Sequence, residues 1–233
     1  MAIHVDDCTI TGSNRVLLNE IKRKIKSKYS LTDLGPVNWL LSIKITRDRA
    51  ARTISLSQES YIDSILMHFN LTDAKPMSTP MDPSMRFLKD QSPQTLEEMA
   101  EMRNVPYQEG TGSLQYCTIA TRPDIAFSVS LLSQYNENPG QIHWEAVKRV
   151  LRYLKATKGW KLVYGTEQDD LKGFTDADGA SQEHRHMISV YIFMIDGSAV
   201  SWSSKKQELV TLSTTESEYV AATYAAKEAL WAQ

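Results

Sequence analysis

Prolines divide this chain of 233 residues into two parts. Five of its eight prolines lie between residues 76 and 106, and the acidic pair Glu97-Glu98 lies among them. Proline lacks a backbone N–H and fixes φ, so such a stretch cannot continue a long helix or a central strand. We therefore expect a connector with one short helix between about residues 75 and 107.

The part before the connector carries alternating strand and helix signals. Apolar residues flank Asp6-Asp7 and predict a short hairpin with the two carboxylates at its tip. Apolar residues at helical spacing predict a helix that ends near Tyr29. Two strands are expected next, over residues 41–46 and 53–57, followed by a helix over 61–69.

The part after the connector is helical and then rich in strands. Helices are expected from Gly112 onward, over 125–132 and over 144–154. Strands are expected over 171–176, 188–195 and 199–202, and a last helix begins near Ser213. Asp196-Gly197 predicts a hairpin turn, because both positions tolerate positive φ. The sequence therefore predicts an α+β fold.

Composition excludes several classes of protein. Hydrophobic residues make up 42% of the chain and charged residues 23%, which argues against disorder. Cys8 and Cys117 fit neither a disulfide framework nor a zinc finger, and they suit a reducing compartment. No run approaches the roughly 20 apolar residues of a membrane span, and the start resembles no signal peptide. We expect an intracellular protein, cytoplasmic or nuclear, that is not secreted and has no membrane partner.

The net charge of −2 conceals two basic stretches. Residues 15–28 hold six Lys or Arg and one Glu, and residues 143–161 do the same. Such charges suit the phosphate backbone of nucleic acid, but a solvated helix face explains either stretch equally well. The candidate nucleic-acid-binding residues are Lys22, Arg23, Lys26, Lys148, Arg149, Arg152 and Lys155.

Two pairs of carboxylates are candidate metal ligands. Asp6 and Asp7 at the predicted hairpin tip could hold the divalent cations of a phosphoryl transfer, with two metals about 4 Å apart. An acidic turn is the more frequent explanation for an isolated Asp-Asp pair. The second pair is Asp176, at the end of the strand over 171–176, and Glu218 on the final helix.

Helix geometry separates Glu218 from its neighbour Glu216. Ser213 and Glu216 match a capping box, which gives Glu216 a structural role. Glu218 lies above a run of alanines, and small residues let a helix approach a sheet closely. Glu218 could then meet Asp176 and share metals with it, although an exposed helix charge explains Glu218 equally well.

The histidines give weaker signals. His184 and His186 flank Arg185, but no cysteine or further histidine is spaced to complete a metal site, so we expect a polar loop there. His143 is interpreted as a residue at a helix start.

Several segments resemble the C-terminal part of the polyprotein of copia-type LTR retrotransposons. His4-Val-Asp-Asp7 is similar to the family's reverse-transcriptase box, in which Tyr usually stands at the position of His4. The segments Thr121-Arg-Pro-Asp-Ile-Ala126 and Val147-Lys-Arg-Val-Leu-Arg-Tyr-Leu154 are similar to its connector. Three further segments are similar to the start of its ribonuclease H domain: Thr175-Asp-Ala-Asp178, Ser201-Trp-Ser-Ser-Lys205 and Leu212-Ser-Thr-Thr-Glu-Ser-Glu-Tyr219. The likeness is colinear over nearly the whole chain.

This resemblance implies a domain organisation. Residues 1–75 would be the end of the reverse-transcriptase palm with the following hairpin and helix, and 76–165 a Pro-rich, then helical and basic connector. Residues 166–233 would be the N-terminal half of a ribonuclease H-like domain. The implied fold is a truncated palm and thumb-connector remnant, followed by three antiparallel strands plus a helix.

The resemblance also implies roles for the candidate carboxylates. Asp6 and Asp7 would bind the Mg²⁺ ions of RNA-directed DNA synthesis. Asp176 and Glu218 would be two metal ligands of ribonuclease H, with Glu216 as the fallback. The implied partners are an RNA–DNA hybrid or template-primer, and the remainder of the polyprotein.

Departures from the family pattern bear on activity. Val190 stands where Gly is common, and Gly179 where many members carry Trp. An earlier palm aspartate and the later ribonuclease H carboxylates are missing from the 233 residues, so both active sites are incomplete. We expect a truncated reverse transcriptase/ribonuclease H fragment with little activity alone, and whether it is an enzyme stays open. The alternative is a non-enzymatic nucleic-acid-binding or interaction remnant that uses the basic helix faces.

Overall fold

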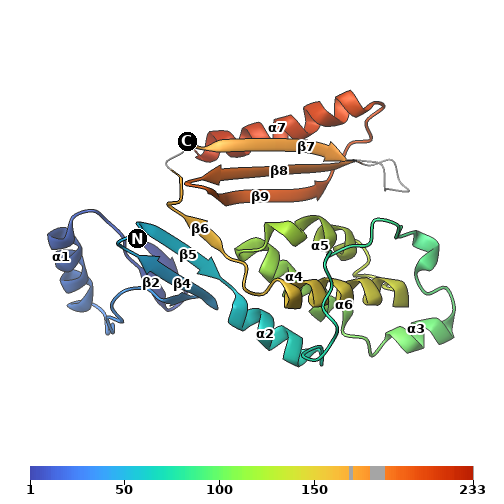
Figure 1. Cartoon of the computed structure of the whole chain (residues 1–233), viewed down its shortest axis with the longest axis horizontal. Coiled ribbons are helices and arrows are strands. Elements are labelled where there is room, and N and C mark those ends of the chain that lie inside the picture. The colour runs from blue at the N-terminus through green and yellow to red at the C-terminus, as the bar shows by residue number, and fades with distance from the viewer. Residues whose placement is uncertain (168–169, 179–186, 233) are drawn as a thin grey trace.

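The strands form three separate antiparallel sheets, with helices between and beside them (Figure 1). The structure is a computed structural model that describes residues 1–167, 170–178 and 187–232. The smallest sheet is the hairpin of β1 (Ala2–His4) and β2 (Asp7–Thr9), as predicted. Helix α1 (Arg15–Lys26) follows it and is capped by Asn14, whose side chain accepts hydrogen bonds from two backbone N–H groups of the first turn.

The second sheet joins segments that are far apart in the sequence. Its order is β3 (Trp39–Leu40), β4 (Ile43–Asp48), β5 (Thr53–Ser57) and β6 (Leu162–Tyr164). β5 begins and ends as predicted. The continuous strand expected over 41–46 is wrong at its start, because Leu41 and Ser42 have φ values of 49° and 59° and form the turn between β3 and β4.

A helical body lies beside the second sheet and, in the view of Figure 1, below the third. Its helices are α2 (Glu59–His68), α3 (Leu96–Met102), α4 (Tyr107–Ala120), α5 (Ala126–Ser133) and α6 (Gln141–Ala156). Two 3-10 turns complete it, η1 (Lys89–Gln91) and η2 (Pro123–Ile125). The expected short connector helix is α3. Within the described residues, no helix is both long and apolar enough to cross a membrane.

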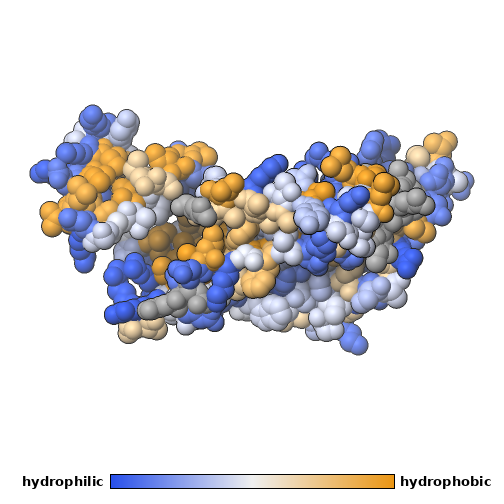
Figure 2. Space-filling model, turned by 90° about the horizontal axis from the view of Figure 1, so that it is seen from above, coloured by the Kyte–Doolittle hydropathy of each residue, from blue (hydrophilic) through white to orange (hydrophobic). Residues whose placement is uncertain are grey.

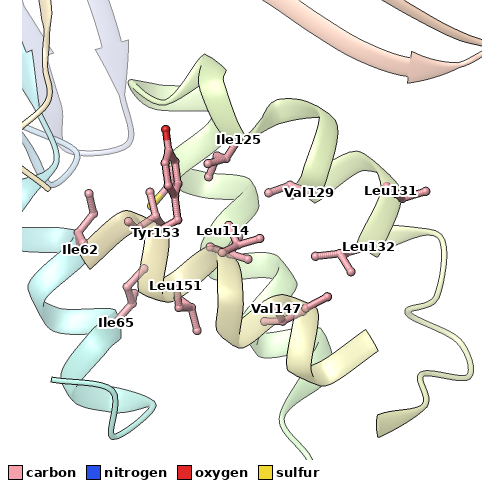
Figure 3. Packing of buried hydrophobic residues seen from close by; sticks show 14 of the residues in the cluster. Ile62, Ile65, Leu114, Ile125, Val129, Leu131, Leu132, Val147, Leu151 and Tyr153 are labelled. Atoms are coloured by element: carbon pink, nitrogen blue, oxygen red, sulfur yellow. The ribbon is translucent and has the colours of Figure 1, made fainter. Parts of the chain in front are cut away.

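Buried apolar side chains of these helices form one core. Figure 3 shows Ile62 and Ile65 of α2 beside Leu151 of α6, with Leu114 of α4 and Val129 of α5 on the other side. The core therefore joins helices from both sides of the proline-rich connector, and burial of each such side chain stabilises the fold by about 1.5–3 kcal/mol.

The third sheet has the order β7 (Lys172–Asp178), β8 (Ile188–Ile195), β9 (Ser198–Lys206). Helix α7 (Thr214–Ala232) packs against β7 and β8. The Asp196-Gly197 turn is confirmed, since both residues have positive φ, 51° and 85°. Mixed helices and antiparallel sheets agree with the α+β expectation.

Candidate active site

The first candidate pair lies at the tip of the β1–β2 hairpin. His4 pairs with Asp7, so Val5 and Asp6 form the two-residue turn and Asp7 begins β2. Val5 has φ of 50°, which is uncommon for a β-branched residue. Asp6 and Asp7 are both exposed. The turn therefore presents two adjacent carboxylates to solvent.

Apolar side chains surround this hairpin without forming a core. Helix α1 has no buried residue, and its apolar residue Leu17 is 53% exposed. Ile3, Val5 and Trp39 are also largely exposed. Figure 2 shows apolar side chains at the left end of the molecule, over this N-terminal part. The candidate carboxylates are thus positioned by a hairpin that stands outside the main core.

Asp176 lies within β7, and the expectation that it ends the strand is wrong, because pairing with β8 continues to Asp178. Asp176 sits directly opposite Val190 of β8 and is exposed. Its Oδ1 accepts a hydrogen bond of 2.9 Å from the N–H of Ala177.

Helix α7 covers the opposite face of this sheet. Gln207 donates hydrogen bonds to Ser189 Oγ (2.9 Å) and to the carbonyl of Ser217 in α7 (3.0 Å). Directly paired residues share a face and successive residues alternate, so Ser189 and its partner Ala177 face α7. Asp176 therefore lies on the face turned away from α7, and the fold alone does not bring it to Glu218.

The two glutamates of α7 have different surroundings. Glu216 accepts a 2.7 Å hydrogen bond from the N–H of Leu212, and its own N–H donates to Ser213 Oγ at 3.2 Å. The reciprocal cap predicted for Ser213 and Glu216 is therefore present, shifted by one residue at the glutamate end. Glu218 is exposed beside Ser217, which is buried.

The carboxylates suit a hard divalent cation by their chemistry, since Mg²⁺ prefers oxygen ligands. Among residues 1–167, 170–178 and 187–232, no three His, Cys, Asp or Glu side chains gather where they could hold a metal ion. His184, His186 and Gly179 lie outside the described residues. The assignment of Asp6, Asp7, Asp176 and Glu218 as ligands stays a prediction.

The basic face of α1 is largely exposed. Lys22 forms an ion pair with Asp33 at 3.1 Å, and Lys24 pairs with Glu20 at 2.8 Å. Hydrogen bonds from the Gly35 N–H and the Lys22 ammonium lower the pKa of Asp33. Arg23 and Lys26 are exposed. The α1 face therefore presents cationic side chains to solvent.

The basic face of α6 has another use. Arg152 Nε donates to the carbonyl of Lys75 at 2.6 Å, and Lys155 donates to the carbonyl of Ala74 at 2.8 Å. Arg149 donates to Thr79 Oγ1 at 2.9 Å and lies 3.5 Å from an Asp82 oxygen. All three cations are half-buried. These three side chains bind residues 74–82, which include the start of the connector and are here called the strap. The strap runs across helix α6.

Lys148 is tied within α6 itself. Its ammonium lies 2.6 Å from Glu145 and 6.0 Å from the centroid of the Trp144 ring. The four candidate residues of α6 therefore all have partners within the chain, and their assignment to nucleic-acid binding stays a prediction.

Arg122 occupies a buried node that sequence reasoning did not assign a role. Its side chain is 2% exposed and binds Asp124 through two hydrogen bonds of 2.9 and 2.7 Å. It also donates to Thr157 Oγ1 at 2.6 Å, and the rings of Tyr153 and Trp160 flank it at 5.6 and 5.7 Å.

Tyr153 completes this node. Its hydroxyl donates to Asp124 Oδ2 at 2.8 Å, and burial together with the Asp124 charge raises the pKa of Tyr153 to about 12. The sequence feature that could have indicated this node is an arginine and an aspartate two residues apart, next to segments that predict apolar helices. The node holds η2 against α6, which makes it structural rather than a substrate site.

Comparisons with known proteins find a reverse-transcriptase family and several retrotransposon proteins. Residues 1–83 match the family model described as reverse transcriptase (RNA-dependent DNA polymerase). The chain is 44% identical over 232 residues to the retrovirus-related Pol polyprotein from transposon TNT 1-94 of Nicotiana tabacum. The alignment covers 99% of this chain and 18% of that protein. It is 32% identical over 225 residues to a transposon Ty5-1 protein of Saccharomyces cerevisiae, covering 95% of this chain and 71% of that protein.

A third relative is an uncharacterized mitochondrial protein of Arabidopsis thaliana, 33% identical over 233 residues and covered over 93% of its length. This chain thus spans a small part of the tobacco polyprotein and most of two shorter relatives. No solved structure matches it significantly.

Proposed function

Because the chain belongs to the copia-type retrotransposon Pol family, we propose that it joins the end of a reverse-transcriptase palm, through a connector, to the first part of a ribonuclease H-like unit. The carrying observation is the exposed Asp6-Asp7 hairpin turn, which lies inside the residues that match the reverse-transcriptase family. The second unit is supported by the antiparallel β7-β8-β9 sheet with α7 on one face.

Each unit contributes two carboxylates to a metal site in this proposal. Asp6 and Asp7 would hold Mg²⁺ at the polymerase site, and Asp176 and Glu218 at the nuclease site. Bound Mg²⁺ stabilises the charge that develops on a phosphate during transfer. The substrate class is an RNA–DNA hybrid or a primed template, and the basic face of α1 suits its phosphate backbone.

The isolated chain is proposed to have little polymerase or nuclease activity. Asp176 faces away from α7, whereas Glu218 lies on that helix. A two-metal centre needs its ligands converging on ions about 4 Å apart. The remainder of a polyprotein would therefore be the partner that completes each site.

Cleavage assays test these assignments. We expect the purified chain with Mg²⁺ to leave a labelled RNA–DNA hybrid uncut. In a TNT 1-94 polyprotein that carries this chain in place of its own segment, Asp176→Asn or Glu218→Gln should lower cleavage about 100-fold or more, because metal stabilisation supplies several kcal/mol.

Glu216→Gln is the matched control, because Glu216 caps α7 and its loss should change stability more than cleavage. Mg²⁺-dependent cleavage by the purified chain that disappears in Asp176→Asn would contradict the proposed inactivity. An equal loss of cleavage in Glu216→Gln and Glu218→Gln would contradict the assignment of Glu218.

A second candidate function is nucleic-acid binding without catalysis, favoured by the exposed Arg23 and Lys26 on α1. Arg23→Glu/Lys26→Glu should weaken hybrid binding and reduce the slope of log K against log salt by about 2, from two lost phosphate contacts. Fluorescence anisotropy between 50 and 200 mM salt, roughly the range over which such contacts matter, measures both.

Arg103→Glu/Lys227→Glu provides the same change of charge at two exposed positions away from α1, one just after α3 and one on α7. It should leave the slope nearly unchanged. If both double variants weaken binding equally, net charge rather than the α1 face governs binding. If neither does, the chain binds nucleic acid elsewhere or not at all.

A further inference from the structure

One short segment belongs to the second sheet and also touches the third. Strand β6 pairs with β5, with Leu162 opposite Leu56 and Tyr164 opposite Ile54. These pairings anchor residues 162–164 to the second sheet. Any contact that they make with the third sheet therefore connects the two sheets directly.

Tyr164 and Gly165 make such contacts. The Tyr164 hydroxyl donates a 2.6 Å hydrogen bond to the carbonyl of Ala199 in β9. The next residue, Gly165, donates its N–H to the carbonyl of Asp196 at 3.0 Å. Tyr164 is half-buried, and this burial raises the pKa of its phenol. Two adjacent residues of one segment thus hold the start of β9 and the turn before it.

Two glycines let these segments approach closely. Gly165 has φ of 92°, and a Cβ there would lie 2.3 Å from the carbonyl oxygen of Arg52. Gly197 has φ of 85°, and a Cβ there would lie 2.3 Å from Thr166 Oγ1. A side chain at Gly165 would clash with Arg52, next to the second sheet, and one at Gly197 would clash with Thr166. The β8–β9 turn therefore fits against residue 166 because Gly197 has no side chain.

A second attachment lies further along β9. The indole N–H of Trp202 donates a 2.9 Å hydrogen bond to the carbonyl of Thr118 in α4. Trp202 pairs with Ile192, on the sheet face opposite to α7. Ala199 and Trp202 are thus held by different elements, and two separate attachments on one strand resist rotation about either of them.

We propose that Tyr164 and Trp202 are positioning residues that fix the third sheet relative to the second sheet and the helical body. The ribonuclease H-like unit would then keep one orientation relative to the palm end, instead of moving freely on a flexible linker. A hybrid bound by both units would meet Asp176 at a constant distance along its length. This inference rests on the proposed function for the identity of the units, whereas the orientation depends on the contacts alone.

Distance measurement by pulsed electron–electron double resonance tests whether the third sheet keeps one orientation relative to the second sheet. Spin labels are placed at Thr46→Cys on β4 and Ala222→Cys on α7, both exposed positions, in a Cys8→Ser background. Cys117 can stay, because it is fully buried and burial raises its pKa to about 12. We expect a single narrow distance distribution for this protein.

Tyr164→Phe/Trp202→Phe removes one hydroxyl and replaces the indole, with its N–H, by a smaller ring. It should broaden the distribution about twofold, as expected when a fixed interface becomes a hinge. Tyr219→Phe, at a residue 73% exposed on α7, is the matched control and should leave the width unchanged. Circular dichroism melts show that the labelled proteins are folded.

Gly197→Ala is a second route to the same result, should the double variant fail to fold, because it disturbs the turn and leaves both aromatic side chains unchanged. A broad or two-peaked distribution of the label-to-label distance in the protein with Tyr164, Trp202 and Gly197 unchanged would overturn the proposal. An unchanged width in both the double variant and Gly197→Ala would also overturn it. Neither result depends on catalysis, so failure of the proposed function would be seen separately in the cleavage assay.

Discussion

Replacing Arg122 by Met is expected to lower the free energy of unfolding by about 3–5 kcal/mol, the usual range for breaking a buried ion pair from one side. Arg122 is almost fully buried, and its loss removes two hydrogen bonds that Asp124 accepts and one that Thr157 Oγ1 accepts. Urea unfolding followed by circular dichroism measures the change. It should be large enough to unfold a marginal protein at 25 °C, since total stabilities are about 5–15 kcal/mol.

The control for Arg122 is Arg103, an exposed arginine just after α3. Arg103→Met should change stability by less than about 0.5 kcal/mol, as is typical of surface substitutions. The double variant Arg122→Met/Asp124→Leu should recover part of the loss, because it removes both charges. Equal effects of Arg122→Met and Arg103→Met would show that the node does not stabilise the fold.

Acid should destabilise the protein through His143, the second large effect. Its ring is fully buried, stacks on Tyr135 at 3.9 Å, and accepts a 2.8 Å hydrogen bond at Nδ1 from the N–H of Gly140. Burial lowers the pKa of His143 from 6.5 to about 4. Protonation at Nδ1 would also convert the acceptor of that hydrogen bond into a donor.

The sign of the change in stability with pH follows from the number of protons bound in the folded and unfolded states. Between pH 6.5 and about 4 the unfolded chain holds a proton on this imidazole that the folded protein lacks. Stability from His143 is therefore complete above pH 6.5 and is lost progressively as the pH falls toward 4, by up to about 3 kcal/mol. Unfolding in urea at a series of pH values measures this slope.

His143→Asn keeps an acceptor for the Gly140 N–H and removes the titration. The variant should be less stable at pH 7, but its stability should vary less between pH 6.5 and 4. A titration by NMR that gives His143 an ordinary pKa, or an equal slope in the variant, would rule out this origin of acid sensitivity.

Local signals in the sequence were sufficient where residues carry their own conformational preference. The Asp196-Gly197 turn forms as predicted, and the Ser213–Glu216 cap forms with one donor shifted to Leu212, because their chemistry acts within a few residues. The turn at Leu41-Ser42 has no such signal. It is held from a distance by the Tyr116 hydroxyl, which donates to the Leu41 carbonyl.

Other features depend on tertiary contacts that no sequence window contains. β6 is three residues long and exists as a strand because it pairs with β5, more than 100 positions earlier. Helix α4 begins at Tyr107, before the expected Gly112, and includes Gly110, where a Cβ would come within 3.0–3.1 Å of Val147 and Trp144. Gly110 weakens the helix signal locally, but it permits α4 and α6 to pack closely.

The candidate site shows the same division. The sequence placed Asp6 and Asp7 on a hairpin and separated Glu216 from Glu218 by capping, since both are local arguments. Charge patterning alone could not distinguish the α1 face from the α6 face, because the partners of Arg152 and Lys155 are backbone carbonyls. The alternation of β7 likewise places Asp176 only after its partner strand and the helix-covered face are known.

The way in which α6 holds the strap also bears on how this segment can change over generations. Arg152 and Lys155 bind the main-chain carbonyls of Lys75 and Ala74, groups that every residue type offers. Substitutions at these two strap positions would therefore keep their anchor, while a substitution at Arg152 or Lys155 would release it. The helix positions are therefore the ones that must keep their residues, whereas the two strap positions can be substituted. The same helix could then hold connectors of different sequence.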